Sequence, residues 1–389
     1  MRDHLVIVSE ESVYAGFYKC GIGEVVDTLA DALRNYLDVT IITPGSHKGG
    51  NMAGSMGGRI RLGLHDEEFY VAAAELVNEI QPAMVQNFGR PDFIDRLTVD
   101  CQKILVFDRW EEDIAGQLDS VAKYDHVVTL STGYANELMA VHPEAVEWPL
   151  HGIINGISSS LYSTPRATKE ESRRHFYGLI GRKDTGKPLM VTTGRLSEVK
   201  GTAELIAATP AIAAAGADLV VYGDGDAEYE AQLIALHEAG KLTFVPRLGD
   251  YFETSHALAA ADFYLTPSLH EVCGLQPMKA ARMGCVPIVR PVGGMGENFN
   301  ESNAVLITDT IEEAVSRAVA MTSDEYGVLR DNCIAGQWTW ETRVLPWLAL
   351  FDLKTGPESE SAFRAVHVIT RRATPVGTAK KCPFAKKGG

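Results

Sequence analysis

Short apolar runs alternate along the chain with stretches whose apolar residues recur at helical spacing. The run Leu5–Val8 predicts a buried strand, and Val25, Leu29 and Leu33 share one face of a helix predicted over 24–36. The same patterns predict strands over 39–42, 84–87, 104–107 and 126–129, and a helix over 69–80. Such alternation is typical of a parallel sheet covered by helices on both faces.

The segment 148–164 is rich in Gly, Ser and Pro and is expected to be a linker, after which the alternation resumes. Strands are predicted over 189–193, 218–222, 243–246, 263–267 and 286–290, and helices over 201–215, 227–239, 251–260 and 274–283. We therefore expect two doubly wound, Rossmann-like α/β domains, whose strand ends face one another across a cleft. The expected limits are 1–155 for the first domain, 156–340 for the second, a helix at about 341–356 that returns to the first domain, and a basic tail over 357–389.

Charge and cysteine content narrow the class of partner. Of the 389 residues, 36 are basic and 51 acidic, a net charge of −15 that argues against binding a nucleic-acid backbone. The six cysteines form no C-x-x-C pair, which is typical of a reducing compartment. No run approaches the roughly 20 apolar residues of a membrane span. We expect a soluble, cytoplasmic protein without an integral membrane segment.

The first candidate for binding chemistry is the loop Lys19–Glu24, between a predicted strand and a helix. Gly21 lets the backbone approach a ligand, and the free N–H groups at a helix start attract anions. Val26 stands where the dinucleotide fingerprint G-x-G-x-x-G needs its third glycine. A purely structural tight turn stays an open alternative.

The second candidate is the segment from Gly194 to Gly201, directly after an apolar strand. Arg195 and Lys200 at the carboxyl end of a strand can hold a diphosphate whose charge grows as it leaves. Two surface cations near a turn are the alternative. The D-x-D pattern of Asp224 and Asp226 lies in a strand-to-helix turn and is interpreted as turn and cap chemistry.

The third candidate is the longest. Glu271 directly precedes a helix that begins with small residues, and Gly293 and Gly294 follow the next predicted strand. A carboxylate there can accept sugar hydroxyls while the N–H groups of the helix meet a phosphate or sugar oxygen. The alternative is that Glu271 simply caps the helix.

The third segment resembles the signature of bacterial glycogen synthases and starch synthases, and more broadly the E-x7-E region of retaining glycosyltransferases with the GT-B fold. The resemblance extends over most of the chain in the same order of motifs: the lysine–glycine loop 19–25, the interdomain stretch 151–157, the arginine–lysine segment 188–201, the glycine turn 222–226 and the closing helix 338–350.

The resemblance implies a site for a nucleotide diphosphate sugar. It implies that Arg195, Lys200, Glu271 and Asp108 carry the chemistry, with Glu271 on the transferred sugar. It further implies donor binding by Lys19, Gly21, Ile22, Gly194, Gly223, Cys273, Gly274, Leu275 and Lys279.

Three positions depart from the family pattern. Ile22 replaces the second of two paired glycines, Lys279 occupies the second E-x7-E position, and Asp108 stands where glycogen synthases carry a histidine. A helix cap or an ion pair with Arg109 is an equal alternative for Asp108.

The resemblance thus implies a retaining transfer of a hexose, glucose first, from ADP-glucose or a UDP-sugar to a small-molecule or oligosaccharide acceptor. No cofactor or metal ion is expected. A sugar-nucleotide epimerase and a catalytically degenerate sugar-nucleotide-binding protein are the rivals, and a homo-oligomer stays open.

Overall fold

The strands of the first half form an eight-stranded sheet in the order β3-β4-β2-β1-β5-β6-β7-β8, parallel except for the pair β3–β4. A computed structural model describes residues 3–10, 21–44, 54–55, 58–107, 115–163, 167–246 and 251–351. The strands are β1 (His4–Ser9), β2 (Asp38–Thr43), β3 (Gly54–Ser55), β4 (Arg59–Arg61), β5 (Met84–Phe88), β6 (Gln102–Phe107), β7 (His126–Thr129) and β8 (Leu150–Gly152).

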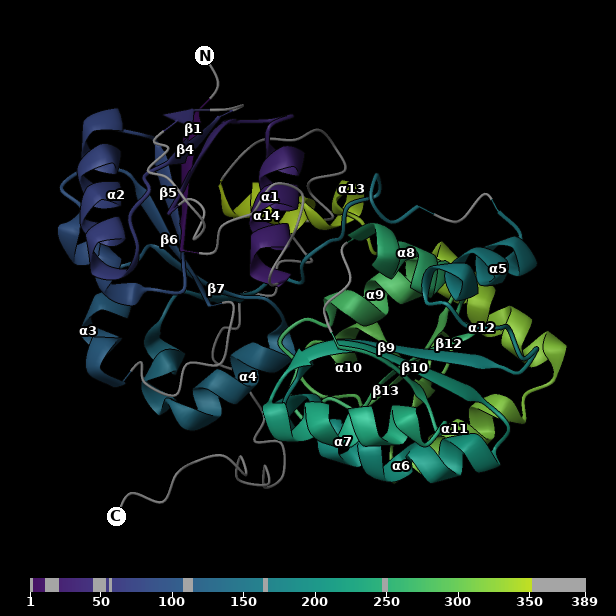
Figure 1. Cartoon of the computed structure of the whole chain (residues 1–389). Coiled ribbons are helices and arrows are strands. Elements are labelled where there is room, and N and C mark those ends of the chain that lie inside the picture. Colours follow the sequence, from purple (N-terminus) through teal and green to yellow (C-terminus); the bar gives the residue numbers. More distant parts are fainter. Residues whose placement is uncertain are drawn as a thin grey trace.

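Helices cover both faces of this sheet, as the alternating pattern predicts (Figure 1). Leu5 and Ile7 of β1 pack with α1 (Gly21–Leu33), whereas Val6 and Val8 pack with α2 (Asp66–Ile80). The remaining helical segments of this half are η1 (Pro91–Arg96), η2 (Ala115–Gln117), α3 (Leu118–Val121), α4 (Thr132–Val141) and η3 (Pro143–Glu147).

The second sheet has six parallel strands in the order β11-β10-β9-β12-β13-β14. They are β9 (Leu189–Leu196), β10 (Asp218–Gly225), β11 (Thr243–Val245), β12 (Phe263–Thr266), β13 (Val286–Val289) and β14 (Val305–Leu306). The helices are α5 (Lys169–Leu179), η4 (Glu198–Lys200), α6 (Thr202–Ala214), α7 (Ala227–Glu238), α8 (Tyr251–Ala260), α9 (Leu275–Arg282), α10 (Met295–Asn298), α11 (Ile311–Val319) and α12 (Ser323–Ala335). The chain thus has the α/β fold class expected, with two sheets side by side (Figure 1).

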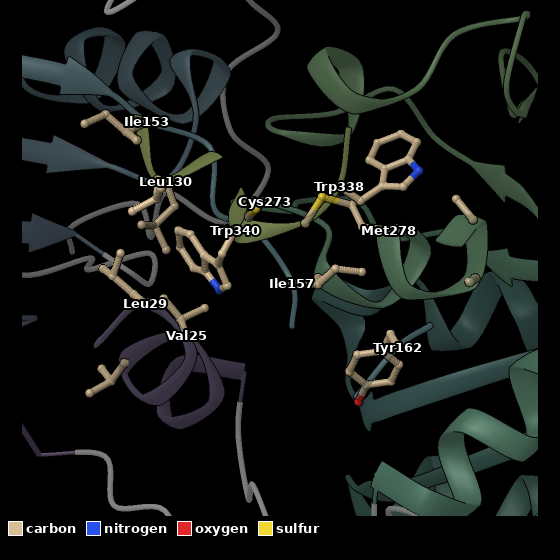
Figure 2. Close-up of a cluster of buried hydrophobic side chains, with 14 of the residues drawn as sticks. Val25, Leu29, Leu130, Ile153, Ile157, Tyr162, Cys273, Met278, Trp338 and Trp340 are labelled. Carbon is tan, nitrogen blue, oxygen red and sulfur yellow. The ribbon is translucent and has the colours of Figure 1, made fainter. Parts of the chain in front are cut away.

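The chain crosses back to the first half through α13 (Trp340–Arg343) and α14 (Leu345–Leu350), which lie beside α1 (Figure 1). Trp340 is buried against α1, and its Nε1 donates a hydrogen bond of 2.8 Å to Oγ1 of Thr28. Figure 2 shows Trp340 in one apolar cluster with Val25 of α1 and Met278 of α9. The two halves therefore share a continuous core at their junction.

One expectation about local structure needs correction, and one helix was not predicted. Leu150–Gly152 lies in the expected linker but forms the edge strand β8, paired with β7, because so short a strand leaves no apolar run. Helix α4 was not expected, since only Tyr134, Ala135 and Leu138 among its residues are buried. The expected domain limits stay a prediction, and the tail 357–389 lies outside the described residues.

Candidate active site

The second sheet brings two of the candidate segments to one point. Its strand order reverses between β9 and β12, which are neighbours in the sheet but far apart in the sequence. Ligands of open α/β sheets bind outside the carboxyl ends of the strands at such a switch point. Arg195 lies near the end of strand β9, Lys200 follows β9 and Glu271 follows β12, so all three lie at the carboxyl edge of the sheet.

Lys200 and Glu271 are in direct contact. Nζ of Lys200 lies 2.6 Å from Oε2 of Glu271, and Oε1 of Glu271 accepts a hydrogen bond of 3.3 Å from the N–H of Gly274. Burial raises the pKa of Glu271, but the Lys200 ammonium and the Gly274 N–H outweigh it, so this pKa lies below its usual range. The carboxylate is therefore ionised at neutral pH and can accept hydroxyl hydrogen bonds.

The loop after β9, which carries Lys200, and the loop after β12, which carries Glu271, lie close together, and this close approach depends on Gly201. This residue has φ 68°, and a Cβ atom there would lie 2.4 Å from the carbonyl oxygen of Pro267. Only glycine fits both the left-handed backbone and the contact. Gly201 thereby lets Lys200 reach the loop that carries Glu271.

Arg195 lies at the end of β9 and is exposed. Among the residues that the structure describes, no acidic side chain pairs with it, so its charge is available to an anion. Gly194 and Gly223 are register partners on β9 and β10, and a Cβ atom at 223 would lie 2.7 Å from the carbonyl oxygen of Gly194. Because Gly223 has no Cβ atom, its backbone can lie this close to β9 beside Arg195.

Two hydrogen bonds hold the loop 271–274, which leads into α9. Gly294 donates a 3.0 Å hydrogen bond to the carbonyl of Glu271, and Nδ2 of Asn298 donates one of 2.8 Å to the carbonyl of Cys273. Burial raises the pKa of Cys273 to about 12, so its thiol stays protonated at neutral pH and is a poor nucleophile. The predicted contribution of Cys273 is accordingly through its backbone.

The first half of the chain meets this loop through α1. Gly21 and Ile22 are the first residues of α1, and a Cβ atom at residue 21 would lie 3.1 Å from Cδ1 of Leu275. The N-terminus of α1 therefore lies against Leu275, directly after Gly274, which has φ 84° and precedes α9. Lys19 and Asp108, both predicted to line the site, lie outside the described residues.

Lys279 occupies a different environment from the other predicted donor-binding residues. Its side chain is only 2% exposed, and its Nζ lies 2.5 Å from Oε2 of Glu24 on α1. The structure thus places Lys279 in the interface between α9 and α1, where its ammonium is already paired.

A second set of contacts joins the two halves of the chain near Glu271, and the sequence analysis did not predict it. Oε2 of Glu137 on α4 lies 3.0 Å from Nδ1 of His270, and Oε1 of Glu297 accepts a hydrogen bond from the N–H of Gly133. The adjacent glycines Gly293 and Gly294 are the sequence feature that goes with this close packing, since a Cβ atom at either would lie within 2.4 Å of a carbonyl oxygen in the loop 271–273.

This architecture, two parallel α/β sheets with a charged switch point facing the other half, is the GT-B fold. Residues 187–324 match the family model described as "Glycosyl transferases group 1". Residues 187–324, which include Arg195, Lys200 and Glu271, are therefore similar to group 1 glycosyltransferases, and the chain has the GT-B fold.

Among curated proteins, the chain is similar to the glycogen synthase of Desulfitobacterium hafniense, at 32% identity over 56% of this chain and 51% of that protein. The chain spans about half the length of the curated relatives it matches.

Among solved structures, the catalytic domain of starch synthase IV from Arabidopsis thaliana, bound to ADP and acarbose, superposes with a TM-score of 0.74 at 17% identity over 90% of this chain and 99% of that one. The Anabaena protein HepE in complex with UDP and glucose gives a TM-score of 0.69 at 13% identity, with 90% of this chain and all of that chain (100%) covered.

In the described ranges, no helix is long and apolar enough to cross a membrane.

Proposed function

We propose that this protein is a retaining hexosyltransferase that moves a hexose, glucose first among candidates, from a nucleotide diphosphate sugar to a hydroxyl acceptor. The observation that carries the proposal is the ion pair of 2.6 Å between Lys200 and Glu271 at the sheet switch point, next to the exposed Arg195. This supports the proposal because cations can hold a diphosphate and a carboxylate can accept hydrogen bonds from sugar hydroxyls, and a nucleotide sugar carries both groups.

In the proposed reaction the bond between the anomeric carbon and the diphosphate oxygen breaks, and a bond from that carbon to the acceptor oxygen forms on the same face. The departing phosphate oxygen takes the acceptor proton. Arg195 and Lys200 stabilise the charge that develops on the diphosphate, and one such contact in a dry site contributes about 3 kcal/mol.

Donor binding also changes the partner of Lys200 in this scheme. The diphosphate competes with Glu271 for the Lys200 ammonium, and Glu271 then accepts hydroxyl hydrogen bonds from the sugar. The cations supply the positive charge, so we expect no metal requirement. A cytoplasmic location, a small-molecule or oligosaccharide acceptor, and ADP or UDP as the donor nucleotide belong to the same proposal.

Thermal unfolding with ADP-, UDP- and GDP-sugars tests donor binding. A ligand at 100 times its dissociation constant stabilises the native state by about 2.7 kcal/mol. We expect one nucleotide class to stabilise the wild type and Arg174→Ala, which removes an exposed arginine on α5, but to stabilise Arg195→Ala much less. No stabilisation of the wild type by any donor would contradict the proposal.

A further inference from the structure

The ammonium group of Lys279 joins three segments of the chain. It lies 2.5 Å from Oε2 of Glu24 on α1 and 4.8 Å from the ring centroid of Tyr162, in the connection between β8 and α5. The exposed fractions of the Lys279 and Glu24 side chains are 2% and 7%. Burial lowers the pKa of Lys279, but Glu24 and Tyr162 outweigh it and raise it above its usual value. The Lys279 ammonium therefore keeps its proton at neutral pH.

The pair lies about one helical turn below two helix N-termini that touch. Glu24 follows Gly21 by three residues on α1, and Lys279 follows Leu275 by four on α9. Gly21 and Leu275 are in contact, since a Cβ atom at 21 would lie 3.1 Å from the Leu275 side chain. Any slip of α1 along α9 changes the distance between the two charges and the distance between the two N-termini together.

Stability alone is a weak reason for an ion pair in this position. The desolvation of two buried charges roughly cancels their attraction, so well-packed apolar residues of similar size are often as stable. What the charges add is a defined register, because a displaced helix leaves a buried charge without its partner. A buried polar contact that fixes register is the best-attested use of such groups.

We propose that Glu24 and Lys279 are positioning residues of the donor site, which hold the N-termini of α1 and α9 together so that the N–H groups of both face the same diphosphate. The inference rests on the proposed function, because it takes the donor to lie at these N-termini. Neither side chain touches the donor in this scheme, and Tyr162 completes the enclosure of the ammonium.

The test replaces both charges by apolar groups of similar size in the full chain, as Glu24→Leu with Lys279→Met. The matched control is Asp31→Leu with Arg34→Met, an ion pair at the C-terminal end of α1 whose side chains are 71% and 33% exposed. We expect the double variant to unfold near the wild-type temperature while donor affinity falls at least about tenfold, or 1.4 kcal/mol. The donor KM should rise and the acceptor KM should not, and the control should match the wild type.

A second variant and a second readout keep the test decisive. Glu24→Asp retains the charge but shortens its reach, and it should raise the donor KM with little change in unfolding temperature. Hydrogen exchange at 21–24 and 275–279 should quicken in the Leu/Met variant without any nucleotide present.

A folded Leu/Met variant with wild-type donor affinity and wild-type exchange would overturn the inference. So would a variant that cannot fold, because the pair would then act through stability. If the wild type binds no nucleotide sugar, the proposed function fails, and the exchange measurement still decides whether the pair sets the register of the helices.

Discussion

Replacing Gly293 by alanine tests whether the contact between Gly293 and the backbone of Glu271 positions the Glu271 carboxylate. Gly293 has φ +47°, and a Cβ atom there would lie 2.0 Å from the carbonyl oxygen of Glu271, where real Cβ atoms essentially never come within 3.0 Å. The substitution must therefore displace one of the two loops by about 1 Å, and a misplacement of this size costs about 100-fold in rate. Gly293 is also packed closely against α4, since a Cβ atom at Gly133 would lie 2.7 Å from the carbonyl oxygen of Gly293.

The assay compares kcat/KM for sugar transfer by Gly293→Ala and by Gly296→Ala, in which the new Cβ atom would lie 3.3 Å from the nearest neighbour, the carbonyl oxygen of Pro291. We expect a loss of about 100-fold, or roughly 2.7 kcal/mol of transition-state stabilisation, for Gly293→Ala and a far smaller loss for Gly296→Ala. Thermal unfolding and hydrogen exchange confirm that each variant is folded. A folded Gly293→Ala variant with wild-type kcat/KM would refute the argument that this loop positions Glu271.

Two further predictions concern charge. Burial, followed by the neighbouring His126, lowers the pKa of His151 to about 4 from its ordinary 6.5. Between pH 4 and pH 6.5 the unfolded chain therefore binds a proton at residue 151 that the folded chain does not bind. The free energy of unfolding accordingly falls as the pH is lowered from 6.5 to 4, by about 3 kcal/mol over the whole range. In His151→Gln the free energy of unfolding, measured with urea, should depend less on pH over this range. An unchanged pH dependence would refute the assignment of this effect to His151. Lys200→Ala should lower turnover by orders of magnitude with folding intact, and near-wild-type steady-state rates would exclude Lys200 from catalysis.

The alternation of apolar runs and amphipathic stretches was enough to predict the α/β class and the elements around the switch point. Lys200 and Glu271 could be expected to approach one another because each follows a strand of the same parallel sheet, and carboxyl ends of parallel strands share one edge. Their predicted roles in catalysis stay predictions.

Contacts between the two halves could not be predicted in the same way. The pairs Glu24–Lys279 and Glu137–His270 depend on how the sheets sit relative to one another, which no local periodicity encodes. Donor binding by Lys279 was expected only from its place at the second E-x7-E position, and nothing in the local sequence pointed to a carboxylate on α1 as its partner.

Product analysis of a single reaction shows whether the chain transfers a sugar. The wild type is incubated with the nucleotide sugar that stabilises it and a panel of hydroxyl acceptors, and the nucleoside diphosphate and the new glycoside are quantified by mass spectrometry and NMR. We predict equal amounts of the two products, with the anomeric configuration of the donor kept. A donor that is consumed or epimerised without forming a glycoside, or that is bound without being consumed, would refute the proposed sugar transfer.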